Sequence, residues 1–116
     1  MSTTAPPPAR ASRQKAATSG SSRAQQSSSL AAETALLQAA RAALGSGDAR
    51  GALALLHQHA REYPNGALVE ERLASQVFAA CALGQRASAA RAAAELIRRA
   101  PSSPLRARVL DSCAGD

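Results

Sequence analysis

The stretch Gly47–Pro64, GDARGALALLHQHAREYP, has a counterpart 37 residues further along the chain, Gly84–Pro101, GQRASAARAAAELIRRAP. Both stretches begin with glycine and end with proline, and Ala52 of the first falls on Ala89 of the second. Between these punctuating residues each stretch is rich in alanine, the residue that most favours a helix. A fixed interval of this length is typical of repeated helical pairs that stack on one another.

Further matches at the same interval extend the repeat beyond these two stretches. They are the series Leu36, Leu73 and Leu110, the pair Arg61 and Arg98, and the pair Leu68 and Leu105. Alanine-rich sequences give accidental matches, but glycine, proline and leucine recurring at one offset indicate a real repeat. We therefore interpret the chain from residue 30 onward as two helical pairs followed by a closing helix.

The helical periodicity and its glycine and proline interruptions predict five helices. We place them over residues 30–44, 48–62, 67–83 and 87–99, and from Ser103 towards Cys113. Asp48 is a good N-cap, and Pro104 suits the first helical position after a capping serine. Aromatic residues make up only 2% of the 116 residues, and the β-branched residues that favour strands are scarce. The predicted fold class is therefore all-α.

Residues 1–29 have a different composition, rich in Ser, Ala, Pro, Thr and Gln. Their charged residues are Arg10, Arg13, Lys15 and Arg23. These supply +4 of the formal net charge of +6, so the rest of the chain is nearly balanced. The first large aliphatic side chain after Met1 is Leu30, and such a segment cannot bury enough apolar surface to offset its ordering entropy. We predict a disordered basic tail over 1–29 and a helical domain over 30–116.

The layout of the helical region resembles the tetratricopeptide repeat (TPR) family. Repeats of that family have a glycine at the turn between two helices, then small and large apolar residues, then a closing proline. The matching residues are Gly47-Asp48, Ala52-Leu53, Leu56 and Tyr63-Pro64, and again Gly84, Ala89 and Pro101. The resemblance implies TPR-like antiparallel helix pairs, namely two repeats plus a C-terminal capping helix. It also implies a non-catalytic protein–protein interaction module, acting as an adaptor or scaffold without cofactors.

Two short segments are similar to one branch of that family. Residues 63–68 and 101–105 resemble repeats of bacterial envelope proteins such as outer-membrane assembly lipoproteins and the Tol-Pal-associated coordinator of cell division. This resemblance implies a bacterial, envelope-associated protein. The chain as it stands has no signal peptide and no apolar run of membrane-spanning length, which predicts a cytoplasmic location. A periplasmic or envelope location is predicted if the chain is a piece of a longer exported protein.

The resemblance further implies that a protein or peptide partner lies on the concave face, which the first helix of each pair lines. The positions expected to contact the partner are Gln38, Arg41, Arg72, Gln76 and Phe78. The residues expected in the core are Leu36, Leu37, Leu44, Leu53, Leu56, Leu73, Val77, Leu83, Leu96, Ile97, Leu105 and Leu110. Two repeats are fewer than the roughly three that a stable solenoid needs, so we expect a homo-oligomer or partner-assisted folding.

Histidine and cysteine are the candidates for metal or redox chemistry. His57 and His59 are two residues apart, and on a helix they project roughly 200° apart, so one points inward and neither forms a metal site with the other. The repeat alignment places Cys113 opposite Gln76, about five residues or roughly 7.5 Å of helix rise from Cys81. This offset favours two packed free thiols over a disulfide or a metal pair. A disulfide between Cys81 and Cys113 becomes the better interpretation only in an exported domain.

No grouping of residues suggests catalysis, because the serines cluster in the basic tail and Glu70-Glu71 fits a solvated helix start. The Gly45–Gly47 loop lacks the lysine of a phosphate-binding loop. We therefore predict that the chain is not an enzyme. The alternative to an adaptor is a basic-tailed accessory protein that binds nucleic acid or an anionic surface and uses its helices to dimerise. Four cations without interleaved aromatic residues would give weak, salt-sensitive binding, so the tail fits a solubilising linker better.

Overall fold

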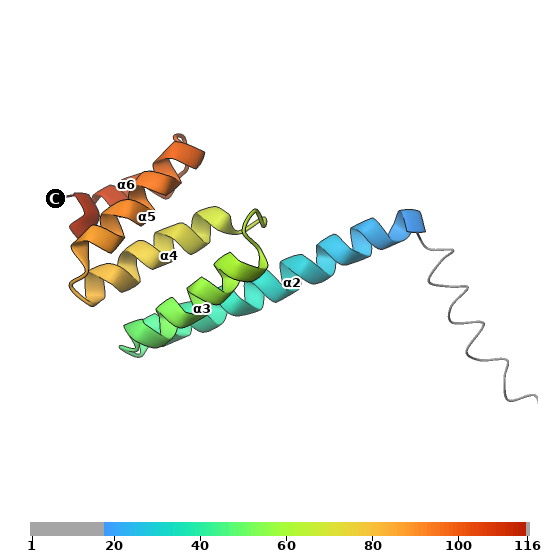
Figure 1. Cartoon of the computed structure of the whole chain (residues 1–116), viewed down its shortest axis with the longest axis horizontal. Helices are drawn as coiled ribbons and strands as arrows, with labels where there is room; N and C mark the ends of the chain where they lie inside the picture. Colours follow the sequence, from blue (N-terminus) through green and yellow to red (C-terminus); the bar gives the residue numbers. More distant parts are fainter. Residues whose placement is uncertain (1–17, 116) are drawn as a thin grey trace, which may run out of the picture.

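The computed structural model describes residues 18–115, and of residues 18–27 it describes the backbone alone. Its elements are α2 (Thr18–Gly45), α3 (Ala49–Glu62), α4 (Val69–Ala82), α5 (Arg86–Arg99), α6 (Arg106–Leu110) and the short 3₁₀ helix η2 (Cys113–Gly115). The part of the chain described is helical and contains no strand, which confirms the predicted all-α class. Helices α2 and α3 form one antiparallel pair and α4 and α5 a second, while α6 and η2 pack against the second pair (Figure 1).

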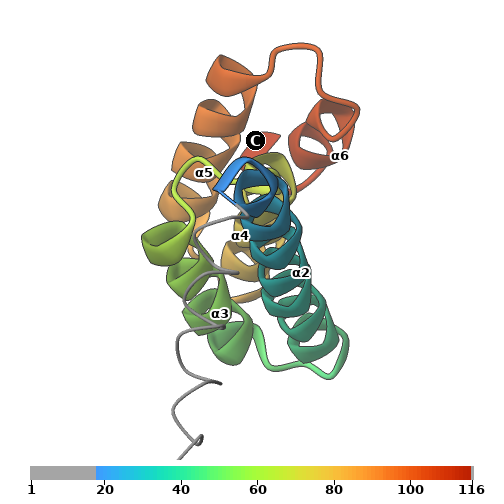
Figure 2. The same cartoon turned by 90° about the vertical axis from the view of Figure 1, so that its right-hand side faces the viewer.

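The helices form two layers. In Figure 2, α3 and α5 lie on one side of α4, while α2 and α6 lie on the other side. Helix α4 is therefore the centre of the domain, and it contacts α2, α3, α5 and α6. The first helices of successive pairs, α2 and α4, thus come together with α6 on one face of the domain.

The interval of 37 residues seen in the sequence is also present in the backbone. Helices α3 and α5 each have 14 residues, and their first residues, Ala49 and Arg86, are separated by that interval. The glycines before them, Gly47 and Gly84, have φ angles of +87° and +73°, a conformation that side chains disfavour. These glycines let the chain reverse tightly between α2 and α3 and again between α4 and α5, which explains why glycine recurs at both turns.

The N-cap of α3 differs from that of α5 in one hydrogen bond. Asp48 Oδ1 accepts a hydrogen bond of 2.9 Å from Gly51 N, whereas Gln85 makes no such bond at the start of α5. We expect Asp48→Ala to lower the free energy of unfolding by about 1 kcal/mol, since one backbone N–H loses its acceptor. Gln85→Ala is the matched control and should change it by less than about 0.5 kcal/mol. Urea denaturation of both variants measures this, and equal losses would contradict the capping role.

The core consists of two clusters of buried side chains. One lies between α2, α3 and α4 and includes Leu37 and Leu56; the other lies between α4, α5 and α6 and includes Leu73 and Leu96. Many of the buried residues between the helices are alanines. The fully buried ones are Ala40, Ala52, Ala79 and Ala89. Side chains this small let the helix axes approach closely, so the domain is packed with few large residues.

Most of the predicted core residues lie inside, but Leu110 does not. Those buried are Leu37, Leu56, Leu73, Val77 and Leu96, and those half-buried are Leu36, Leu44, Leu53, Leu83, Ile97 and Leu105. Leu110 is 44% exposed. Helix α6 has five residues and contacts α4, α5 and η2, and its buried residue is Val109 rather than its neighbour Leu110. The prediction for Leu110 was therefore wrong because α6 turns Val109, and not Leu110, towards the core.

The first helix begins earlier than the sequence indicated. We expected a start near Leu30, but α2 starts at Thr18 and has 28 residues. No proline interrupts residues 18–45, and extending an existing helix costs much less than nucleating one. The upstream part of α2 projects past the end of α3 (Figure 1). The expected boundary at residue 29 is therefore too late for the helix, and residues 1–17 of the expected tail lie outside the described residues.

Candidate functional site

A groove lies on the face of the domain formed by α2, α4 and α6. It encloses about 470 Å³ and is lined by Arg41, Leu44, Glu71, Ala74, Ser75, Phe78, Leu105 and Arg108. Ala74 and Ser75 are buried, so they form a floor of small side chains between α2 and α6. Leu44, Phe78 and Leu105 are half-buried and leave apolar surface along the groove. The groove therefore lies between helices and has a mixed apolar and polar lining.

Phe78 and Arg108 are in contact across the groove. The guanidinium carbon of Arg108, on α6, lies 5.4 Å from the centre of the Phe78 ring, on α4. This distance is within the range of a cation–π interaction, which weakly favours the observed position of Arg108. The pair places a positive charge directly beside an aromatic surface.

The charged residues of the groove lining give it a net positive charge. Arg41 and Arg108 are exposed, and Glu71 is half-buried. Among the described residues, neither arginine forms an ion pair with a carboxylate. A ligand that brings a negative group into the groove would meet two exposed guanidinium groups and one carboxylate.

The structure separates the five residues predicted to contact a partner. Arg41 and Phe78 come together in the groove, and Gln38 is exposed one helical turn before Arg41 on α2. Gln76 instead lines a second hollow of about 360 Å³ between α3, α4 and α5. Arg72 is only 4% exposed, so it is not available on the surface as expected. Leu105 and Arg108 were missed as groove residues because they come from the short α6 and the residue just before it.

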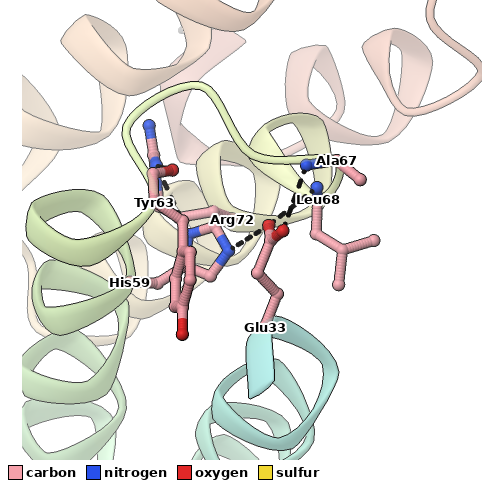
Figure 3. Close-up of polar contacts among 6 residues, drawn as sticks. All are labelled: Glu33, His59, Tyr63, Ala67, Leu68 and Arg72. Atoms are coloured by element: carbon pink, nitrogen blue, oxygen red, sulfur yellow. Dashed lines mark hydrogen bonds and ion pairs between the residues drawn. The ribbon is translucent and has the colours of Figure 1, made fainter. Parts of the chain in front are cut away.

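Arg72 belongs to a buried polar cluster that the sequence did not predict. Glu33 on α2, His59 on α3 and Arg72 on α4 meet where the two helical pairs join (Figure 3). His59 Nε2 lies 2.9 Å from Glu33 Oε1, and His59 Nδ1 lies 3.3 Å from an amino group of Arg72. Because arginine only donates, Nδ1 accepts, and Nε2 carries the proton donated to Glu33. Burial lowers the pKa of Arg72, an effect that Arg99 adds to and that Glu95 and Glu33 oppose.

Glu33 also caps the segment that leads into α4. Its two carboxylate oxygens accept hydrogen bonds from the backbone N–H groups of Ala67, at 3.2 Å, and Leu68, at 3.1 Å. A Cβ atom at Gly66 would collide with this carboxylate, so glycine is needed for the close approach. Glu33 lies near the middle of α2 and is only 3% exposed. The cluster is closed to solvent and serves to join the helical pairs.

The repeat interval explains how this cluster arises. The positions 37 residues after Glu33, His59 and Arg72 hold Glu70, Leu96 and Val109. Leu96 and Val109 are fully buried. The repeat therefore has apolar side chains at the positions that correspond to the histidine and the arginine of the polar cluster. The alignment of His59 with Leu96 was thus the signal in the sequence that His59 is a core residue. His57 is exposed, which confirms that one histidine of the pair points inward and the other outward.

Cys81 and Cys113 form a disulfide, with their Cα atoms 5.7 Å apart. The preference for two free thiols was therefore wrong. Helix α6 ends at Leu110, and Ser112 Oγ accepts a hydrogen bond of 3.1 Å from Ala114 N as the chain turns into η2. Cys113 therefore does not continue the axis of α6, which the expected offset from Cys81 had assumed.

In comparisons with known proteins, no family model, no curated protein and no solved structure matches this chain. None of the described helices has the length and apolar character needed to cross a membrane. Among the described residues, no three His, Cys, Asp or Glu side chains are grouped as metal ligands. The basic residues Arg10, Arg13 and Lys15 lie outside the described residues, and the side chain of Arg23 is likewise not described.

Proposed function

We propose that this chain is a non-catalytic protein–protein interaction module of the tetratricopeptide type, and that the groove between α2, α4 and α6 binds a peptide segment of a partner protein. The observation that supports the proposal is the placement of two exposed arginines, Arg41 and Arg108, beside the apolar surface of Phe78. The sequence resemblance and the recurrence of helix ends every 37 residues point to the same class.

The lining of the groove suggests the chemistry of the peptide. Phe78, Leu44 and Leu105 offer an apolar surface to a large apolar side chain. Arg41 and Arg108 offer charge-assisted hydrogen bonds to carboxylates on either side of it. The proposed ligand is therefore a segment in which acidic residues flank a large apolar residue.

We expect Arg41→Gln combined with Arg108→Gln to weaken the binding of such a peptide about tenfold, which is about 1.4 kcal/mol. The peptide is selected from a random peptide library on the oxidised full chain, and its affinity is measured by fluorescence anisotropy at physiological salt. The matched control is Arg50→Gln with Arg61→Gln, which removes two exposed arginines of α3 and leaves the groove intact. Equal affinities for the two double variants would reject the groove as the binding site.

The same titrations separate an adaptor from the basic-tailed alternative. Binding through the tail depends on Arg10, Arg13, Lys15 and Arg23 and decreases steeply as salt is raised. Binding in the groove also involves apolar contact and is retained at physiological salt. The selected peptides would favour the tail if they contained no large apolar residue and if their binding was lost when the salt was raised. Their affinity would then also be unchanged by the substitutions at Arg41 and Arg108.

We also propose that the protein acts in an oxidising compartment, as expected of a bacterial envelope protein. The Cys81–Cys113 disulfide supports this location, since disulfides persist outside the reducing cytosol. Alkylation of free thiols in intact cells, followed by analysis of the chain, tests it. A chain whose two cysteines are both alkylated without prior reduction would contradict the proposal.

A further inference from the structure

Helix α6 is held to the rest of the domain by few side chains. It has five residues, of which Val109 alone is buried, and η2 after it has no buried residue. Leu105, just before α6, is half-buried and packs at the edge of the second cluster. So small an apolar contact provides little stabilisation, because hydrophobic stabilisation grows with the apolar area buried. A covalent attachment would therefore contribute much of what holds α6 in place.

The Cys81–Cys113 disulfide supplies that attachment. Cys81 lies in the last turn of α4, and Cys113 begins η2, shortly after α6. The bond joins residues 32 apart in sequence, and the enclosed loop contains all of α5 and α6. A cross-link that closes a loop of this length strongly limits the conformations available when the enclosed segment detaches.

Helix α6 also completes the groove. Arg108 and the adjoining Leu105 form the wall opposite α2, and Arg108 covers the ring of Phe78. Without α6, Phe78 would face solvent, and Arg41 would be the remaining arginine of the groove lining. The shape and charge of the groove thus depend on the position of α6.

We propose that the Cys81–Cys113 disulfide is a redox-dependent clamp that holds α6 against α4 and so makes the groove competent to bind. The effect on binding rests on the proposed function, whereas the release of α6 does not. The chain would be competent in an oxidising compartment and would lose its groove wall in a reducing one.

The chemistry of release requires a dithiol reductant. One thiolate of the reductant attacks a cysteine sulfur, the protein S–S bond breaks, and a mixed disulfide forms. The second thiolate of the reductant then displaces the remaining protein thiolate, and the reductant becomes a disulfide. The protein gains two electrons and two protons and ends with two thiols. Cys81 and Cys113 are both half-buried, so neither residue is fully enclosed by the fold.

Hydrogen exchange on the full chain, oxidised or reduced with dithiothreitol, tests the release directly. We expect exchange to become at least about tenfold faster at Val109 and Asp111, whose N–H groups bond Leu105 O and Ala107 O, and little changed in α3. The variant Cys81→Ser with Cys113→Ser should match the reduced chain and not respond to the reductant. Unchanged exchange in α6 would overturn the clamp, and so would faster exchange throughout α2–α5, which would show global destabilisation instead.

Peptide binding separates this inference from the proposed function. The peptide selected on the oxidised chain should bind the reduced chain about tenfold more weakly, as the groove loses Arg108 and Leu105. If α6 is released but the affinity is unchanged, the clamp does not control binding. If the Arg41 and Arg108 double variant binds normally, the groove assignment fails, while the exchange result still decides whether the clamp exists.

Discussion

Replacing Glu33 by alanine is expected to lower the free energy of unfolding by about 3 to 5 kcal/mol, the largest effect of any single polar substitution proposed for this chain. The substitution leaves His59 buried without its carboxylate partner and removes one of the two carboxylates that favour the charged form of Arg72. It also removes the acceptor for the N–H groups of Ala67 and Leu68. Desolvated polar groups without partners are costly, and here several lose their partner together. Urea denaturation followed by far-UV circular dichroism measures the loss.

Two comparisons make this prediction specific. Glu62→Ala removes an exposed glutamate bonded to Gln58, and it should change the free energy of unfolding by less than about 0.5 kcal/mol. His59→Leu with Arg72→Val copies the residues that the repeat places 37 positions later. It should cost less than Glu33→Ala, since Glu33 keeps its hydrogen bonds from the N–H groups of Ala67 and Leu68. A Glu33→Ala loss below about 1 kcal/mol would mean that the cluster contributes no more than an ordinary hydrogen bond.

Leu56→Ala is expected to lower the free energy of unfolding by about 2 to 5 kcal/mol. Leu56 is fully buried between α2, α3 and α4 and packs among alanines. Alanine side chains are too short to move into the cavity that the substitution would leave. Thermal unfolding of the variant should show a melting temperature lower by roughly 10 °C or more for a domain of this size.

Leu110→Ala is the control for this core substitution. The side chain removed is the same, but Leu110 is largely exposed on α6. We expect it to change the free energy of unfolding by less than about 0.5 kcal/mol. Similar losses for Leu56→Ala and Leu110→Ala would mean that the second leucine packs against a surface absent from the described fold.

The helical pairs were predictable because their boundaries are set by local chemistry. Asp48 caps α3 with its own side chain, Gly47 and Gly84 adopt positive φ angles, and proline follows the end of each second helix. Each of these signals acts over three or four residues and is visible in the sequence. The start of α2 was missed because residues 18–29 carry no stop signal and no apolar stripe, so their composition alone suggested disorder.

The site was less predictable because it depends on contacts between distant segments. Arg41 and Phe78 were correctly expected on one face, since they lie on the first helices of the two pairs. Arg72 was misplaced because its burial depends on distant residues, namely His59, which lies 13 residues away, and the carboxylates of Glu95 and Glu33. The disulfide was missed because the turn at Ser112, stabilised by the serine hydroxyl, shifts Cys113 off the axis of α6.

The disulfide has a mechanical consequence as well. A force applied at the two ends of the chain passes from Cys81 to Cys113 through the sulfur atoms and bypasses the residues between them. The enclosed segment, which includes α5 and α6, therefore carries no load while the bond is intact. At roughly 3.4 Å per extended residue, about 110 Å of contour length is withheld from stretching. The oxidised chain is thus a shorter tether than the reduced one, with α2, α3 and α4 bearing the tension and α5 shielded from it.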